Sequence, residues 1–178
     1  SLLTMWDINY LHINTDDHMQ DILVGSSISS PFFADIFIEC VKFFEEYDSL
    51  LTTTSSSFDF VSKQKQIPVV ALKETSFIVY SSILSTGPAI MDYLLISDQQ
   101  LADEVSRHSV MVAYICGLMG KQMNLGDTEL QTLTLSALLH DIGKMVIAKE
   151  GNPEPHAHII NGGQLLRNVE GLPEEVML

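Results

Sequence analysis

The stretch LLHDIGK at residues 138–144 constrains this chain more than any other, because it places a histidine beside an aspartate at the end of a leucine-rich helical run. Burying an unpaired carboxylate among apolar side chains is costly. The cost is avoided if both groups bind one metal ion, since imidazole nitrogen and carboxylate oxygen are ordinary ligands of Zn, Mn and Fe. A metal site at His140 and Asp141 is therefore the first hypothesis.

Further candidate ligands flank this pair. His108 lies 32 positions before His140 (140 − 108), and His158 lies 18 positions after it (158 − 140). Glu104 precedes His108 by one helical turn, so its carboxylate can reach the same point in space. His156 lies two residues before His158.

The second part of the chain has the spacing of helices. The Gly-Pro pair at 87–88 should end or kink the first helix after residue 73. Capping residues then predict helices over about 98–123, 127–143 and 158–169, with another beginning near 172.

Helical spacing also predicts where the ligands lie. On the first of these three helices Val105, His108 and Val112 share one face, which places His108 on a buried stripe with Leu101, Ile115 and Met119. His140 and His158 likewise follow the apolar faces of their helices. We therefore expect three helices to present ligands toward one point, as helical bundles do when they build metal sites.

Before residue 73 the pattern differs. Residues 8–13 and 34–40 alternate with a period of about two, residues 68–72 form a short β-branched run, and the Ser/Thr patch at 52–57 is typical of a loop. The predicted fold is therefore mainly α, with a small α+β regulatory domain at residues 1–73 before a helical bundle at 74–178.

Composition narrows the class of function. A formal charge of −14 and a pI of about 4.5 argue against binding a nucleic-acid polymer, which requires basic side chains to neutralise phosphates. No stretch of the sequence is typical of a secretory signal or a membrane span. Cys40 and Cys116 are far apart and form no CxxC motif, so we expect free thiols in a reducing cytoplasm.

Each candidate ligand also has an ordinary structural explanation. A single core histidine is more often hydrogen-bonded than metal-bound, and Asp141 could merely orient His140. Glu104 could be a surface residue, and Lys144 could be a solvated charge favoured by the helix dipole. The joint pattern favours a metal centre, because such residues are hard to explain together as independent accidents.

These residues carry a resemblance. The dipeptide HS at 108–109, LHDIGK at 139–144 and HIINGGQLL at 158–166 resemble the HD superfamily of metal-dependent phosphohydrolases, and most of all its HD-GYP branch. The segment LPEEV at 172–176 is similar to the segment that comes after the third histidine in that branch. The resemblance extends from about residue 98 to residue 178.

The resemblance implies an activity and a set of site residues. HD-GYP proteins typically hydrolyse cyclic di-GMP, a bacterial second messenger, by a water activated at two or three divalent metal ions, with Fe or Mn favoured over Zn. Asp141 would bridge two ions, and Lys144 would contact substrate phosphate, so both count as catalytic. The implied metal ligands are Glu104, His108, His140, Asp141 and His158. The resemblance favours His158 over His156 because Gly162 follows it at the family's spacing, so we expect His156 to face solvent or to lie behind the ligands.

Two classes of function stay open at this point. One is a phosphodiesterase that acts on cyclic di-GMP or, less typically, on another nucleotide. The other is a regulatory HD-GYP-like module with little or no turnover, and residues 1–73 could bind a protein partner or form a dimer. The family's later His-His pair and Gly-Tyr-Pro motif do not occur between His158 and Leu178, so we expect the domain to continue beyond Leu178.

Overall fold

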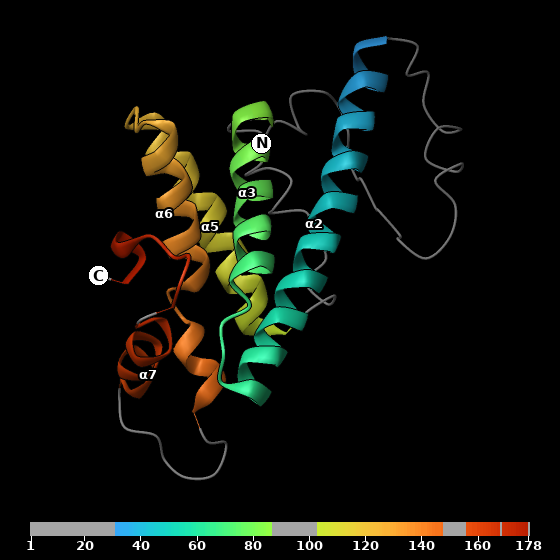
Figure 1. Ribbon diagram of the computed structural model, residues 1–178. Helices are drawn as coiled ribbons and strands as arrows, with labels where there is room; N and C mark the ends of the chain where they lie inside the picture. The colour runs from blue at the N-terminus through green and yellow to red at the C-terminus, as the bar shows by residue number, and fades with distance from the viewer. Residues whose placement is uncertain (1–30, 87–102, 148–155, 168, 178) are drawn as a thin grey trace. The chain divides into compact units, whose positions relative to one another are not determined.

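The computed structural model describes residues 31–86, 103–147, 156–167 and 169–177, and these residues form helices joined by turns, with no strand among them (Figure 1). Two compact units are separated between Glu39 and Cys40, and the core and the candidate site lie in the second. The α-helices are α2 (Pro31–Gln64), α3 (Val69–Thr86), α5 (Glu104–Gln122), α6 (Asp127–Leu139) and α7 (Ala157–Leu166), and the short 3-10 helices are η2 (Ile142–Val146) and η3 (Glu174–Met177).

Helices α3, α5 and α6 pack against one another and form the centre of the second unit. They lie side by side in Figure 1, in green, yellow and orange. Small side chains allow the close approach, because a Cβ at Gly117 of α5 would overlap the end of the Ile83 side chain on α3 and lie 2.8 Å from Thr134 Cγ2 on α6. The buried side chains from these helices include Leu72, Val79, Ile83, Val110, Ala113, Tyr114, Leu130, Leu135 and Leu138.

The part of α2 that follows residue 41 joins the same core. Its buried residues repeat at spacings of three and four, which is the period of a helix with one buried face. The Phe43 and Tyr47 rings stack with centroids 5.8 Å apart, and Phe43 lies 5.9 Å from the ring of Tyr114 on α5. Residue 73, where the sequence suggested a domain boundary, lies within α3.

The predicted strands at 34–40 and 68–72 are wrong, because both segments are helical. Residues 34–40 belong to α2, whose later turns have the helical spacing that a short alternating window does not reveal. At 68–72 the decisive signal is Pro68, which stands just before the first turn of α3, where proline is well tolerated. The strand predicted at 8–13 lies outside the described residues.

The Ser/Thr patch at 52–57 is also helical rather than a loop, since it lies in the middle of α2. The Thr52 and Thr54 hydroxyls donate hydrogen bonds to the carbonyl oxygens of Asp48 and Leu50, at 2.9 and 2.7 Å. Such bonds to the preceding turn satisfy a hydroxyl inside a helix, so a run of these residues need not break one.

The three helices predicted around the site are confirmed, with shifted ends. Helix α5 begins at Glu104, where the Asp103 carboxylate accepts from the Ser106 amide as an N-cap. Helix α6 stops at Leu139 and is followed by η2, and α7 stops at Leu166. Helix α3 ends at Thr86, immediately before the Gly-Pro pair, as predicted.

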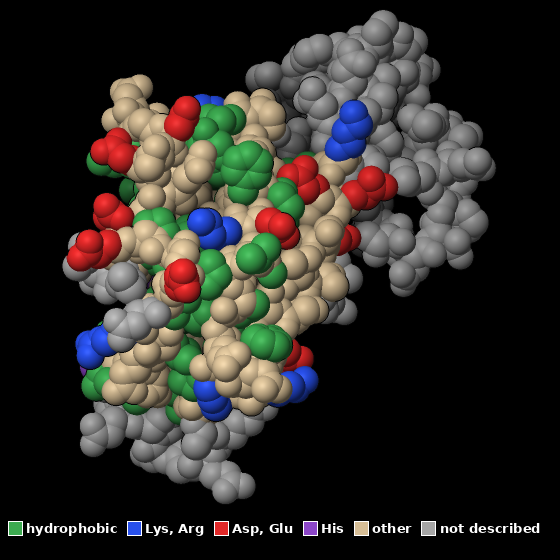
Figure 2. Space-filling model, in the orientation of Figure 1, with side chains coloured by type: hydrophobic (Ala, Val, Ile, Leu, Met, Phe, Trp, Pro, Cys, Tyr) green, Lys and Arg blue, Asp and Glu red, His purple; other side chains and the backbone are tan. Residues whose placement is uncertain are grey.

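No described helix is long and apolar enough to cross a membrane. On the face shown in Figure 2, acidic side chains are spread among hydrophobic ones rather than gathered into one patch. Several large apolar side chains are exposed, among them Val70 and Phe77 of α3.

Candidate metal centre

The site is built where α6 ends. His140 is the last residue with helical dihedral angles, and Asp141 leaves the helix with φ −106° and ψ 9°. This bridge region is sparsely occupied in general and is common among active-site residues. The Lys144 amide then donates to the Asp141 carbonyl at 2.9 Å, which starts the tighter turn of η2. The change from α-helix to 3-10 helix places the Asp141 carboxylate among side chains from neighbouring elements.

Three imidazoles and one ammonium group surround the Asp141 carboxylate. Its Oδ2 atom lies 3.2 Å from His140 Nε2, 3.6 Å from His108 Nε2 and 2.6 Å from Lys144 Nζ. Its Oδ1 atom lies 3.8 Å from His158 Nε2. Residues from α5, the end of α6, η2 and α7 therefore meet at one carboxylate.

The Asp141 carboxylate is ionised at neutral pH in these surroundings. Its side chain is only 8% exposed, and burial by itself would raise the pKa of Asp141. The hydrogen bond and the positive charge of Lys144, together with the nearby imidazoles of His140 and His108, outweigh burial, so the pKa of Asp141 is lowered. A buried anion therefore stands among groups that favour its charged form.

The His140 ring is oriented as a metal ligand. Its Nδ1 atom lies 2.7 Å from the Ala137 carbonyl oxygen, which can only accept, so Nδ1 carries a proton and donates it. In the neutral ring Nε2 is then an unprotonated nitrogen, and its lone pair faces the Asp141 carboxylate. Two lone pairs repel each other unless a cation lies between them. Metal-binding histidines commonly donate a hydrogen bond from the N–H group of their other ring nitrogen to a carbonyl oxygen in this way.

The donor set fits a divalent cation. His108, His140 and Asp141 each offer one ligand atom within 4.8 Å of the others. Metal–ligand bonds of about 2.0–2.2 Å place neighbouring ligand atoms of one ion roughly 3 to 3.5 Å apart. The separations of 3.2 and 3.6 Å between Asp141 Oδ2 and the two imidazoles are close to that range.

The structure places His108 on the edge of α5 rather than on its buried face, so the predicted burial of His108 is wrong, although Val105 and Val112 of the same stripe pack against the core. The His108 side chain is 50% exposed, and Met119 on the same stripe is also exposed. The buried face of α5 consists mainly of small residues, because α3 and α6 approach it closely. It comprises Ser106, Ser109, Val110, Ala113, Tyr114, Gly117, Leu118 and Gly120.

The remaining predicted site residues have different outcomes. Glu104 is exposed in the first turn of α5, and the group of potential ligand atoms does not include it. His158 lies beside Asp141, whereas His156 is exposed and forms the N-cap of α7 with a left-handed φ of 74°. The centroids of these two rings are 6.5 Å apart, and His158 is the one of the two that lies near the Asp141 carboxylate.

Sequence reasoning missed two contributors to the site. One is the Ala137 carbonyl, which orients His140 and which spacing alone could have suggested, because it lies one turn before the histidine. The other is the contact between Gly143 and Gly162, where the backbones of η2 and α7 meet. The signal was present in the sequence, since a glycine inside a helical pattern often marks a close approach.

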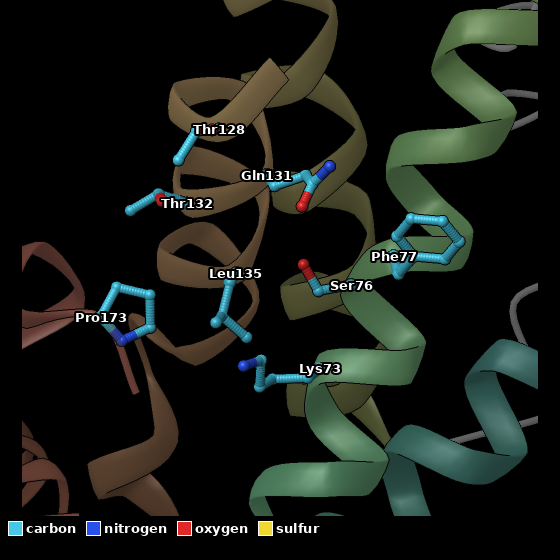
Figure 3. Close-up of a pocket in the computed structure, with 8 residues that line it drawn as sticks. All are labelled: Lys73, Ser76, Phe77, Thr128, Gln131, Thr132, Leu135 and Pro173. Atoms are coloured by element: carbon cyan, nitrogen blue, oxygen red, sulfur yellow. The ribbon is translucent and has the colours of Figure 1, made fainter. Parts of the chain in front are cut away.

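A separate shallow pocket lies between α3, α6 and the turn before η3 (Figure 3). Its volume of about 170 Å³ is below the roughly 300 Å³ at which small-molecule sites begin. It shares no lining residue with the histidine cluster, so it adds nothing to the candidate metal centre. The lining residues are Lys73, Ser76, Phe77, Thr128, Gln131, Thr132, Leu135 and Pro173.

Comparison with protein families identifies an HD domain at residues 105–177. This segment extends from the first turn of α5 to the end of η3, and it contains every residue of the cluster around Asp141. The match covers less than half of the chain and supports the resemblance of this segment to the HD superfamily. Neither the curated proteins nor the solved structures yield a match to the chain.

Proposed function

We propose that this protein is a metal-dependent phosphodiesterase of the HD-GYP type that hydrolyses cyclic di-GMP. The observation that carries the proposal is the convergence of His108, His140 and His158 on the Asp141 carboxylate. Imidazole nitrogens around a carboxylate form the donor set of a transition-metal ion. The HD domain match supports the reaction class.

Asp141 is suited to bridge two metal ions. Its Oδ2 atom faces His108 and His140, whereas its Oδ1 atom faces His158. The carboxylate would therefore hold metal together with these three imidazoles. A mixed nitrogen and oxygen set suits Fe or Mn at least as well as Zn. When bound, such ions lower the pKa of a water molecule and polarise phosphoryl oxygens.

The protein's own residues would then bind and orient the substrate. Lys144 is the cationic side chain nearest to Asp141, and its long stem allows the ammonium group to move from the carboxylate to a phosphate oxygen. There it would offset the charge that grows on the non-bridging oxygens during attack on phosphorus. Asp141 would hold the ions, and the Ala137 carbonyl keeps the His140 ring in place.

The exposure of the ligands supports a large substrate. The side chains of His108 and His140 are 50% and 36% exposed, so the cluster lies at the surface rather than inside a closed bundle. A cyclic dinucleotide can approach such a site without prior opening of the core. The choice of cyclic di-GMP among nucleotides rests on the resemblance of residues 139–144 and 158–166 to the HD-GYP branch.

Asp141→Ala tests the proposal. The purified protein, prepared without oxygen, is analysed for bound metal and is then assayed for release of linear product from cyclic di-GMP. We expect the variant to lose most of its metal and all measurable hydrolysis, because it lacks the central carboxylate. The matched control is Asp59→Ala, which removes an exposed carboxylate on α2 and should change neither quantity.

The two readouts separate the alternatives. Wild-type protein that binds metal and cyclic di-GMP without cleaving it would point to a regulatory module instead of an enzyme. Full metal occupancy in Asp141→Ala would refute the assignment of this carboxylate. Circular dichroism of the variant shows whether its helices have formed, so loss of metal can be distinguished from loss of fold.

A further inference from the structure

Gly143 lies where two ligand-bearing segments touch. A Cβ atom at this position would overlap the carbonyl oxygen of His158 and lie 2.5 Å from the amide nitrogen of Gly162. Atoms cannot approach so closely, so any side chain at residue 143 would force η2 and α7 apart. Gly143 has no left-handed dihedral angle, and therefore the close approach is the reason for glycine here.

The opposing residue is a glycine as well. A Cβ atom at Gly162 would lie 3.5 Å from the Gly143 amide nitrogen and 3.7 Å from its Cα atom, which is ordinary contact. The backbones of η2 and α7 thus meet with no side chain between them. By contrast, a Cβ atom at the neighbouring Gly163 would meet nothing within 4 Å.

This contact is a large part of what holds α7 in place. Among the described residues of α7 only Gly162 and Leu166 are buried, whereas Ile159 and Ile160 are 60% and 65% exposed. The main packing partner of α7 is η2. The position of α7 therefore depends on the contact between the two glycines together with Leu166, which belongs to the hydrophobic core.

The same contact fixes one ligand relative to another. The residue whose carbonyl lies over Gly143 is His158 itself, and Asp141 is two residues before Gly143. The distance of 3.8 Å between His158 Nε2 and Asp141 Oδ1 is thus set by a backbone contact close to both residues. A shift of α7 by the width of a methyl group would carry the imidazole out of reach.

We propose that Gly143 is a positioning residue whose missing side chain sets the metal affinity of the site through His158. The inference rests on the metal centre proposed above. It differs from a general packing role, because only an effect that acts through His158 disappears once that imidazole is removed. A double-mutant cycle makes this distinction.

The cycle compares wild type, Gly143→Ala, His158→Ala and the double variant, with Mn²⁺ binding measured by calorimetry on the full chain. We expect each single variant to weaken Mn²⁺ binding by about 10- to 100-fold, the range seen when support of a ligand is lost. The double variant should bind no more weakly than His158→Ala alone. Gly163→Ala is the control, and its affinity should stay within about two-fold of wild type.

A second pair of variants serves if Gly143→Ala does not fold. Gly162→Val adds a branched side chain whose Cβ would lie 3.5 Å from the Gly143 amide nitrogen, whereas Gly163→Val adds the same side chain where a Cβ meets nothing within 4 Å. Both carry the same cost in helix propensity. We expect only Gly162→Val to weaken Mn²⁺ binding. This effect should disappear when Gly162→Val is combined with His158→Ala.

Two results would overturn the inference. In the first, Gly143→Ala or Gly162→Val binds Mn²⁺ with an affinity within about two-fold of wild type. In the second, the losses of Mn²⁺ affinity caused by Gly143→Ala and His158→Ala multiply in the double variant. If wild type binds Mn²⁺ normally in either case, the proposed function stands and only the role of Gly143 falls. Wild-type protein that binds no Mn²⁺ would refute both.

Discussion

A carbonyl and a lysine define the chemistry of the central residues. The Ala137 carbonyl fixes which nitrogen of His140 carries the proton, and the Lys144 ammonium group supplies positive charge at Asp141 Oδ2. Lys144 thus stands close to where a metal ion would be needed. Binding of metal should free this ammonium group for a phosphate, because both cations compete for the same oxygen atom.

His158 and His156 differ in role, although they are two residues apart. We predict that His158→Ala weakens Mn²⁺ binding by at least about 10-fold, because it removes an imidazole next to Asp141. His156→Asn should leave the affinity unchanged, since asparagine tolerates the left-handed conformation of the α7 N-cap. Titration of each variant with Mn²⁺ followed by calorimetry measures both effects. Weaker binding in the His156 variant alone would reverse the assignment.

The residues of the cluster could be predicted because their chemistry is specific. A His-Asp pair with histidines upstream and downstream has few structural explanations, and the structure brings four of the five predicted ligands together: His108, His140, Asp141 and His158. Glu104 could not be placed, because helical spacing shows only that it shares a side of α5 with His108. It does not show whether the Glu104 carboxylate reaches the atoms around Asp141.

At the scale of elements, the buried face of α5 differs from the face that hydrophobic periodicity predicts. The buried face of this helix holds Ser106, Ala113 and Gly117, which a count of large apolar residues passes over. Small residues are buried there because α3 and α6 approach closely, and this is a property of the neighbours. Helix α2 was missed for a related reason, since hydroxyl groups bonded to their own backbone look like a loop in sequence.

The N-terminus of α5 provides a test at this scale. Burial alone would raise the pKa of Asp103, but hydrogen bonds from the Ser106 hydroxyl and amide and from the Ser55 hydroxyl lower it. We predict that Asp103→Ala reduces the free energy of unfolding by about 1 kcal/mol at pH 7, the usual cost of losing an N-cap. Urea denaturation measures the difference.

The same variant has a defined pH dependence. Because the pKa of Asp103 is lower in the folded state, its stabilising effect is complete above the unfolded value of about 3.9 and is lost as the pH falls through the folded value. The difference in stability between wild type and Asp103→Ala should therefore shrink below about pH 4. A difference that stays constant down to about pH 3 would show that the ionised carboxylate is not the source of the effect.

At the scale of the whole molecule, charge and site are complementary. The chain carries a formal charge of −14, which attracts divalent cations and repels a phosphate substrate. The cluster gathers three imidazoles and a lysine around one carboxylate, so it is a local exception to this acidic character. Bound metal ions would add positive charge to the cluster. We therefore expect an anionic substrate to bind after the metal rather than before it.

Anomalous diffraction from crystals grown with Mn²⁺ tests the central claim most directly. We predict a peak about 2.0–2.3 Å from an Asp141 carboxylate oxygen and from Nε2 of His108 and His140, with the Lys144 ammonium group displaced. A structure at saturating Mn²⁺ that has no peak among these atoms, and in which Lys144 still contacts Asp141, would contradict the account.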